Sequence, residues 1–167
     1  ACDTILTNLR DFNRQAGDYD AIITGDLGNV GKEALFKLLE EQKVDISDRY
    51  YDCGMLMYDT QKQDVHAGGS GCGCSATVLS AYLLHKIEAG EWNRILFVPT
   101  GALLNKTSFN EGQNVPGIAH GVVRSNRIKK STVRGSGGLT VLFIFIEKTD
   151  SVMWKAHTVI CFGKLYA

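Results

Sequence analysis

The chain has 167 residues, which is enough for one domain with a sizeable core. A hydrophobic fraction of 44% and a charged fraction of 22% exclude a disordered chain. Eighteen Lys and Arg residues balance eighteen Asp and Glu residues. The chain therefore has no net charge that would attract nucleic acid, and we expect no nucleic-acid partner.

The charges are not evenly distributed along the chain. Residues 1–123 carry ten basic and sixteen acidic side chains, a formal charge of −6. Residues 124–167 carry eight basic and two acidic side chains, a formal charge of +6. An asymmetry of this size indicates that the two stretches differ in role or in origin.

The longest apolar run, the N-terminus and the cysteine count indicate where in the cell the protein is expected. The longest apolar run, Leu139–Ile146, is well short of the roughly 18 residues needed to span a bilayer. The N-terminus has no signal sequence and does not begin with Met, so we expect it to start within a longer protein. Five cysteines, an odd number, favour reduced thiols and an intracellular location.

The first elements follow from hydrophobic spacing. Apolar residues at helical intervals predict a helix over 3–15, followed by a short apolar strand over 19–24. A turn over 25–29 then leads into a predicted helix over 30–42. Residues 55–58 have a weak strand pattern.

Strand and helix continue to alternate further along. Residues 75–89 have helical spacing, and Gly90 stands where a left-handed C-cap is expected. Apolar strands are predicted over 95–98 and 118–123. This alternation favours an α/β fold with helices packed on a sheet.

The C-terminal stretch has a different character. Residues 124–138 are basic and rich in Ser and Gly, which is typical of a linker. Within 139–167, two predicted strands at 139–146 and 158–162 suggest a β-hairpin. Two strands alone are marginally stable in water, so they would have to pack on something or remain poorly ordered.

A glycine-rich run at His66–Ala76 is the most informative segment for chemistry. Its glycines permit tight turns and close backbone contacts, and it leads directly into the predicted helix 75–89. We weigh two interpretations, a packed turn with two small buried thiols or the wall of a functional pocket. At a helix N-terminus, Cys74 would be partly thiolate. The Cys-x-Cys spacing does not suit zinc, so no metal site is expected.

A second polar stretch follows the strand at 95–98. It comprises 99–104 and 108–118, which form either a solvated loop or part of a ligand site, because α/β proteins bind ligands beyond strand ends. His120 is interpreted as a histidine of the core or of a site's rim. Asp26, at the strand-to-helix turn, is interpreted as a helix cap.

Three segments together resemble a known family. Gly25–Gly31, Asp64–Ala76 and Ser108–Gly121 are similar to the C-terminal half of the stage V sporulation protein AD family, a thiolase-like group of spore-forming bacteria. The run at Gly69–Ala76 is the most specific of these features. The resemblance covers residues 1–123, whereas 124–167 match nothing in the family; they are a divergent extension, a fused piece or the read-through of a disrupted gene.

The resemblance implies a fold and a role. The expected fold is the C-terminal half of a thiolase-like layered sandwich with an unmatched basic C-terminal tail. The expected function is non-enzymatic binding of dipicolinic acid during its uptake into developing spores, alongside membrane proteins of the same operon. The expected location is intracellular in the sporulating cell, peripheral to the spore inner membrane. A homodimer is also considered, because a thiolase-like half normally packs against its twin.

Two departures from condensing enzymes of the superfamily support a role without catalysis. Those enzymes have a His at the position of Gly25 and an Asn at the position of Cys72, and both polarise the substrate carbonyl. Glycine has no side chain with which to donate, and a thiol donates weakly. We therefore expect no catalytic residues and no cofactor in this chain.

The glycine-rich run then supplies the hypothetical ligand contacts. The candidates are Ser70, Cys72, Gly73, Cys74 and Asn110. Two other functions stay open. One is an acyl-transferring enzyme of the thiolase superfamily whose nucleophile lies in a missing N-terminal half, and the other is a scaffold that docks to a spore membrane protein.

Overall fold

The computed structural model describes residues 1–102, 105–114, 117–125, 128–134 and 140–146. The helices of this part are α1 (Cys2–Asp11), α2 (Gly28–Glu41), α3 (Cys53–Leu56), α4 (Cys74–Val78), α5 (Leu84–Glu88) and α6 (Lys106–Asn110). Two 3-10 turns, η1 (Ala16–Asp18) and η2 (Ser47–Arg49), and one π turn, η3 (Leu79–Leu83), accompany them. The strands are β1 (Ala21–Thr24), β2 (Tyr50–Asp52), β3 (Arg94–Val98), β4 (Thr100–Ala102), β5 (Gly117–Ala119), β6 (Val122–Ser125), β7 (Ile128–Arg134) and β8 (Thr140–Ile146).

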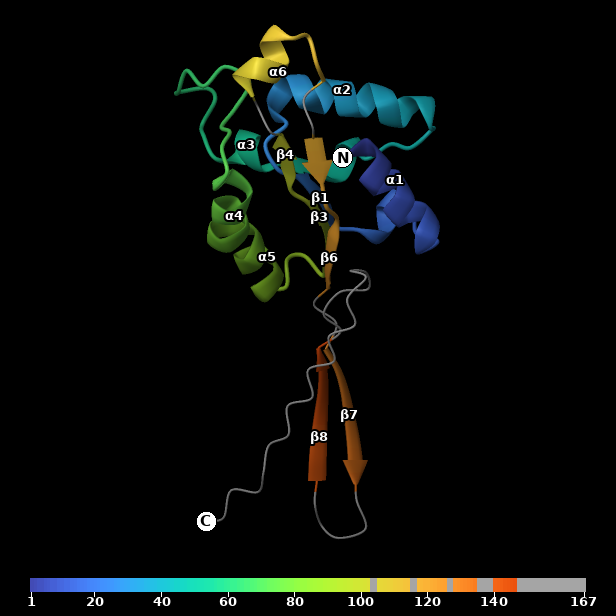
Figure 1. Cartoon of the computed structure of the whole chain (residues 1–167). Coiled ribbons are helices and arrows are strands. Elements are labelled where there is room, and N and C mark those ends of the chain that lie inside the picture. Colours follow the sequence, from blue (N-terminus) through green and yellow to red (C-terminus); the bar gives the residue numbers. More distant parts are fainter. Residues whose placement is uncertain (103–104, 115–116, 126–127, 135–139, 147–167) are drawn as a thin grey trace.

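Four strands form a mixed sheet in the order β2-β1-β3-β6 (Figure 1). Strand β1 runs parallel to β2 and to β3, whereas β6 is antiparallel to β3. Thr24 is in register with Asp52 on one side and with Val98 on the other. The carboxyl ends of three parallel strands therefore meet at one edge of the sheet, where α/β proteins usually place a ligand.

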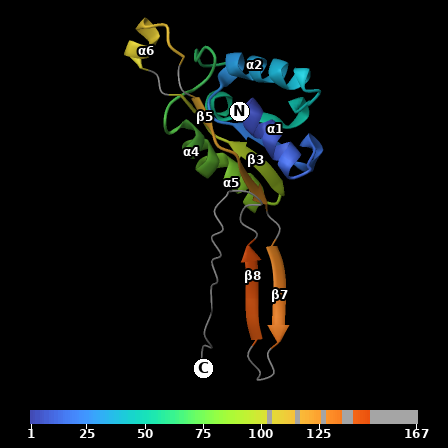
Figure 2. The same cartoon turned by 45° about the vertical axis from the view of Figure 1, so that its right-hand side comes forward.

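Helices cover both faces of this sheet (Figures 1 and 2). Ile22 and Leu96 pack on one face with α1 and α2, and Ile23 and Phe97 pack on the other with α3, α4 and α5. Every residue of β1 is buried, as expected for a strand covered on both sides. The described residues 1–125 thus form three layers, helix, sheet and helix.

A second ribbon extends the sheet beyond its carboxyl edge. Strand β4 follows β3 directly and pairs antiparallel with β5, which precedes β6. Pro99 separates β3 from β4 because proline has no N–H to donate to the ladder. The predicted strand 118–123 is correspondingly divided into β5 and β6. Helix α6 lies at the outer end of this ribbon, away from the other helices (Figure 2).

Most elements predicted from spacing are confirmed. The predicted helices 3–15 and 30–42 correspond to α1 and α2, and the helix 75–89 corresponds to α4, η3 and α5 in succession. Gly90 has φ of +74°, the left-handed conformation expected at a helix C-cap. The general α/β class is confirmed by the mixed sheet, while the thiolase-like layering stays a prediction.

The predicted strand at 55–58 is wrong. Cys53–Leu56 form helix α3, and the carboxylate of Asp52 caps it by accepting a hydrogen bond from the Met55 N–H at 3.2 Å. A buried aspartate at this position satisfies a free N–H of the first turn, so the chain enters a helix instead of continuing β2.

The C-terminal stretch forms a hairpin, but not between the two strands that the sequence predicts. Residues 128–134 lie within the predicted linker 124–138 but form β7, which pairs with β8 from Ile128↔Ile146 to Arg134↔Thr140. A hairpin is thus present, but its partner for 140–146 is β7; the predicted strand 158–162 lies outside the described residues. The predicted division of the chain into residues 1–123, 124–138 and 139–167 stays a prediction.

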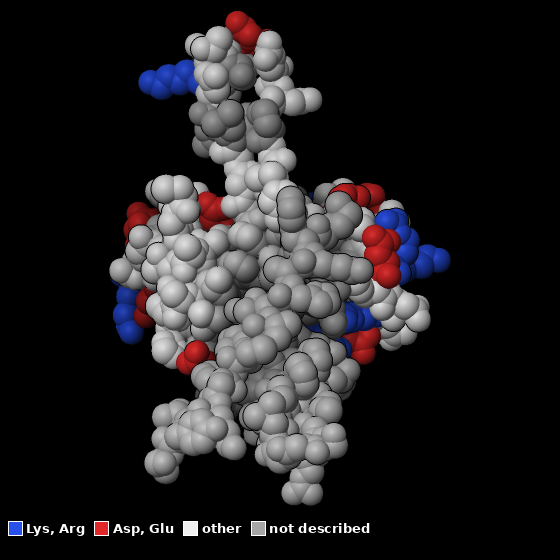
Figure 3. Space-filling view, turned by 60° about the horizontal axis from the view of Figure 1, so that its bottom comes forward, with Lys and Arg blue, Asp and Glu red and all other residues white. Residues whose placement is uncertain are grey.

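Acidic and basic side chains are mixed on the part of the surface that Figure 3 shows. Figure 3 shows acidic and basic residues around the rim of one face, with no separation into regions of one sign. No helix of the described residues is long and apolar enough to cross a membrane.

Candidate functional site

An open cleft of about 990 Å³ lies at the carboxyl edge of the sheet. One wall is the glycine-rich segment, another is the β4–β5 ribbon, and the turn after β1 forms the base between them. The residues that line it are Ala1, Asp3, Thr4, Asp26, Leu27, Ser70–Cys72, Thr100–Ala102 and Gly117–His120. The cleft therefore occupies the position where parallel strands direct their following loops toward a ligand.

Asp26 joins three of the segments that form the cleft. Its Oδ2 accepts a hydrogen bond from the Ser70 hydroxyl at 2.6 Å and another from the Gly71 N–H at 3.1 Å. Its Oδ1 accepts a hydrogen bond from the Thr100 hydroxyl at 3.1 Å, and its own N–H donates back to Thr100 Oγ1 at 3.0 Å. A single carboxylate thus connects the β1–α2 turn, the glycine-rich segment and β4.

These contacts also fix the charge of Asp26. Desolvation by burial acts to raise the pKa of Asp26, but the hydrogen bonds from Ser70, Gly71 and Thr100 outweigh it and lower the pKa below its ordinary value. Asp26 is consequently an ionised acceptor at neutral pH. Leu27 is the N-cap residue of α2, and its side chain makes no capping hydrogen bond. The carboxylate of Asp26 binds Ser70, Gly71 and Thr100 instead of the start of α2, so the interpretation of Asp26 as a helix cap is wrong.

Beneath Asp26, glycines allow three backbone segments to touch. The Gly69 N–H donates to the Gly54 carbonyl at 2.8 Å, and the Gly54 N–H donates to the Gly25 carbonyl at 3.0 Å. A Cβ on Gly54 would lie 2.2 Å from the Gly69 carbonyl oxygen, and one on Gly25 would lie 2.4 Å from the Thr100 nitrogen. Only glycine fits at these two positions without moving the backbone.

A second carboxylate, Asp52, supports the base of the cleft from within the core. It is almost fully buried, at 1% exposure. Its oxygens accept hydrogen bonds from the Thr24 hydroxyl at 2.7 Å and from the Leu27, Gly28 and Met55 N–H groups at 3.0, 3.1 and 3.2 Å. Four donors compensate for burying this charge, so Asp52 holds the end of β1 and the starts of α2 and α3 together.

The cleft includes only some of the predicted ligand contacts. Ser70 and Cys72 line it, whereas Gly73, Cys74 and Asn110 do not. Gly73 is the N-cap residue of α4, and Asn110 ends α6 at the outer end of the ribbon. The five residues therefore do not form one site.

Cys74 lies in the core instead of the cleft. Its side chain packs among apolar residues and is 4% exposed. Burial, with the charges of Asp26 and Asp52, raises the pKa of Cys74, and burial likewise raises the pKa of Cys53 to about 12. The expected thiolate at Cys74 is therefore wrong, since desolvation outweighs the position at a helix start.

Sequence reasoning placed Thr100 within the polar stretch 99–104, a candidate part of a ligand site, without giving it a role, and it missed Asp52. Asp52 lies in β2, a strand that spacing did not predict, so nothing in the sequence indicated its role. His120 is exposed and lines the cleft, as one of the two interpretations allowed.

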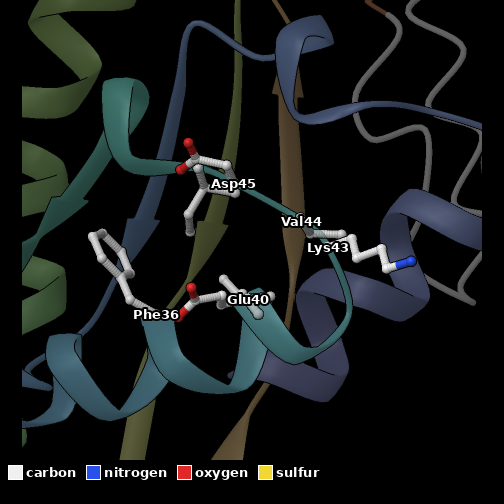
Figure 4. Close-up of a pocket in the computed structure, with 7 residues that line it drawn as sticks. Phe36, Glu40, Lys43, Val44 and Asp45 are labelled. Atoms are coloured by element: carbon white, nitrogen blue, oxygen red, sulfur yellow. The ribbon is translucent and has the colours of Figure 1, made fainter.

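A smaller pocket of about 350 Å³ lies at the end of α2 (Figure 4). Phe36, Leu39 and Ile46 provide apolar surface, with the carboxylates of Glu40 and Asp45 beside it. In Figure 4 the Lys43 side chain extends away from Phe36 and Asp45. Among the described residues, no three His, Cys, Asp or Glu side chains are grouped to hold a metal ion.

These features define an α/β protein with an open ligand-type cleft at the carboxyl edge of its sheet. The chain belongs to the stage V sporulation protein AD family, whose model matches residues 1–125. It is 45% identical over 123 residues to stage V sporulation protein AD of Bacillus subtilis strain 168, a match that covers 74% of this chain and 36% of that protein. Family membership places the chain among sporulation proteins, and the chain spans about a third of the length of this relative.

Proposed function

We propose that the chain is a ligand-binding part of the machinery that takes up dipicolinic acid into developing spores, and that it is not an enzyme. Membership of the stage V sporulation protein AD family supports the sporulation role. The single observation that carries the non-enzymatic role is the contact between Gly25 and Thr100 at the base of the cleft.

That contact closes the position where condensing enzymes of the thiolase superfamily carry a histidine. A Cβ at Gly25 would lie 2.4 Å from the Thr100 nitrogen and 2.8 Å from the Ser75 hydroxyl oxygen. The second carbonyl-polarising position is occupied by Cys72, a weak donor. Loss of one such donor reduces the rate by about 10² to 10³ in acyl-transfer enzymes. Binding without acyl transfer is the function that this geometry favours.

The lining of the cleft suits a small aromatic acid. Dipicolinic acid is a flat pyridine ring with two carboxyl groups. Leu27 and Ile118 contribute apolar surface, while Ser70, Cys72 and His120 contribute polar groups. Polar and apolar groups together line the cleft, with Asp3 and Asp26 among the polar ones, and such a mixed lining occurs in small-molecule sites.

The setting of the protein forms part of the proposal. Because the chain spans 36% of its Bacillus relative, the complete receptor includes further sequence. We place it at the inner membrane of the developing spore, together with membrane proteins of the same operon, and with a second copy of the chain as a further candidate partner.

Calorimetric titration of dipicolinic acid into the full chain tests the proposal. We expect saturable binding that weakens about 3- to 10-fold in Ser70→Ala, because one hydrogen bond contributes about 1 kcal/mol. A similar loss is expected in Cys72→Ala. The same titration is made with a longer protein in which the N-terminal part of the Bacillus relative precedes the chain.

Asn110→Ala is the matched control, because Asn110 is polar and exposed but lies outside the cleft. It should leave the affinity unchanged. Binding by the longer protein alone would mean that the pocket is shared with the preceding part. If neither protein binds, dipicolinate binding is excluded and a scaffold becomes the better explanation. Thiolysis of an acyl-CoA by the longer protein would contradict the non-enzymatic role.

A further inference from the structure

The two hydroxyl groups at the base of the cleft already donate their protons to Asp26. A hydroxyl group has one proton to donate and two lone pairs with which to accept. Ser70 gives its proton to Asp26 Oδ2, and Thr100 gives its proton to Oδ1 of the same carboxylate. An ionised carboxylate has no proton to return. While these two hydrogen bonds are kept, neither hydroxyl can also donate to a ligand.

What remains at this base is a set of acceptors. Both lone pairs of Ser70 are free of donors among the described residues, and one lone pair of Thr100 already receives the Asp26 N–H. A carboxylate brought against these oxygens would find lone pairs and the charge of Asp26, and both are unfavourable to it.

We propose that Asp26 sets the ligand specificity of the cleft: by taking the protons of Ser70 and Thr100, it leaves only acceptors at the base, so the ligand group that reaches this base must carry its own proton. This inference rests on the proposed function in naming dipicolinic acid as the ligand. One carboxyl group of dipicolinic acid would then bind in its protonated form. Its O–H donates to Ser70 Oγ or Thr100 Oγ1, and the proton comes from solvent.

Other titratable groups surround Asp26. Proton uptake by these groups must be distinguished from proton uptake by the ligand. Those in the cleft or on the segments packed beneath Asp26 are the α-amino group of Ala1 and the side chains of Asp3, Asp52, Cys53, Cys72, Cys74 and His120. Among them His120 is the residue that carries an imidazole group. His120→Gln is therefore included, so that uptake by the ligand is distinguished from uptake by the protein.

The decisive measurement is proton uptake on binding. Titrations of dipicolinic acid into the full chain at pH 7.5, in two buffers of different ionisation enthalpy, give the number of protons taken up. We expect about one proton per ligand in the unaltered chain and in His120→Gln. The affinity should then fall about tenfold per pH unit between pH 6 and pH 8. Asp26→Asn, which frees at least one hydroxyl proton, should reduce the uptake and flatten this slope.

A second probe, pyridine-2,6-dicarboxamide, carries its own N–H donors and no charge. The unaltered chain should bind it more tightly than dipicolinic acid at pH 7.5, and Asp26→Asn should reverse that order. Asn110→Ala, which lies outside the cleft, is the control and should behave as the unaltered chain. If Asp26→Asn fails to fold, the relative affinity of the unaltered chain for the two ligands still tests whether the base of the cleft prefers a group that carries its own proton.

The outcomes separate the two proposals. Dipicolinic acid bound without proton uptake and more tightly than the dicarboxamide would overturn the role of Asp26 and leave the proposed function standing. The dicarboxamide bound alone would support the role of Asp26 and overturn dipicolinate binding. Binding of neither compound would overturn both.

Discussion

Gly25 shows how one residue without a side chain constrains the base of the cleft. Its α-carbon faces the backbone and the hydroxyl of Thr100, and the space for a Cβ is already filled. The requirement is steric and not conformational, because Gly25 is not among the glycines with positive φ. Its tolerance to substitution therefore depends on whether Thr100 can move.

We expect Gly25→Ala to destabilise the protein by about 1–3 kcal/mol, the usual cost of adding a methyl group to a filled space. Thr100 would have to retreat, which also lengthens its hydrogen bonds to Asp26. Thermal or urea unfolding measures the loss. Gly17→Ala is the control, because no atom lies within 4 Å of a Cβ there; equal effects at the two positions would contradict the steric argument.

Asp52 acts at the scale of elements, because its four hydrogen bonds connect β1, α2 and α3. We expect Asp52→Asn to lower the free energy of unfolding by about 2–4 kcal/mol, since at least one buried N–H loses an ionised acceptor. Urea denaturation checks this value.

An aspartate-to-asparagine substitution at an exposed position is the control. It shows whether the loss of stability in Asp52→Asn comes from the hydrogen bonds that Asp52 makes to β1, α2 and α3. The Asp64 side chain is 88% exposed and lies 3.6 Å from the exposed imidazole of His66, so Asp64→Asn should change stability by less than about 0.5 kcal/mol. A loss of less than about 1 kcal/mol in Asp52→Asn would show that the three elements hold together without this carboxylate.

At the same scale, the elements divide clearly into those that spacing predicts and those that it does not. Helix α2 and strand β3 were predictable because their apolar residues recur at the interval of one buried face or form one buried run. Helix α3 was not, because its four residues are too few for a period and its start depends on Asp52, which lies next to it in sequence but is held by contacts with β1 and α2.

The candidate site was predictable in position but not in its connections. The glycine-rich run and the loop after 95–98 could be identified as cleft walls because both follow local sequence rules. The hydrogen bonds from Ser70 and Thr100 to Asp26 span 44 and 74 residues. No local pattern relates positions so far apart, and Cys74 was misplaced because its orientation depends on which helix face the sheet covers.

At the scale of the whole molecule, the four-stranded sheet is complete at Ser125, which is also where the family match ends. Strands β7 and β8 pair with each other in a separate two-stranded sheet. The part of the chain that carries the cleft therefore contains its own core.

We expect a chain ending at residue 125 to unfold at nearly the same temperature as the full chain, within about 3 °C, because an isolated hairpin contributes little stability. Differential scanning calorimetry compares the two. A substantially lower transition in the shorter chain would show that residues 126–167 pack on the sheet. Removal of 1–20 instead should abolish cooperative unfolding, since Ile5 and Leu9 of α1 belong to the core.

The filled space beside Gly25 also bears on how the cleft could change over generations of mutation. A histidine could occupy position 25 only if Thr100 withdrew from it, yet Thr100 shares two hydrogen bonds with Asp26. Either substitution made first would weaken the base of the cleft before the other could compensate. Recovery of a carbonyl-polarising side chain at this point thus requires paired changes at positions 75 residues apart, and single substitutions will tend to keep the cleft as a binding site.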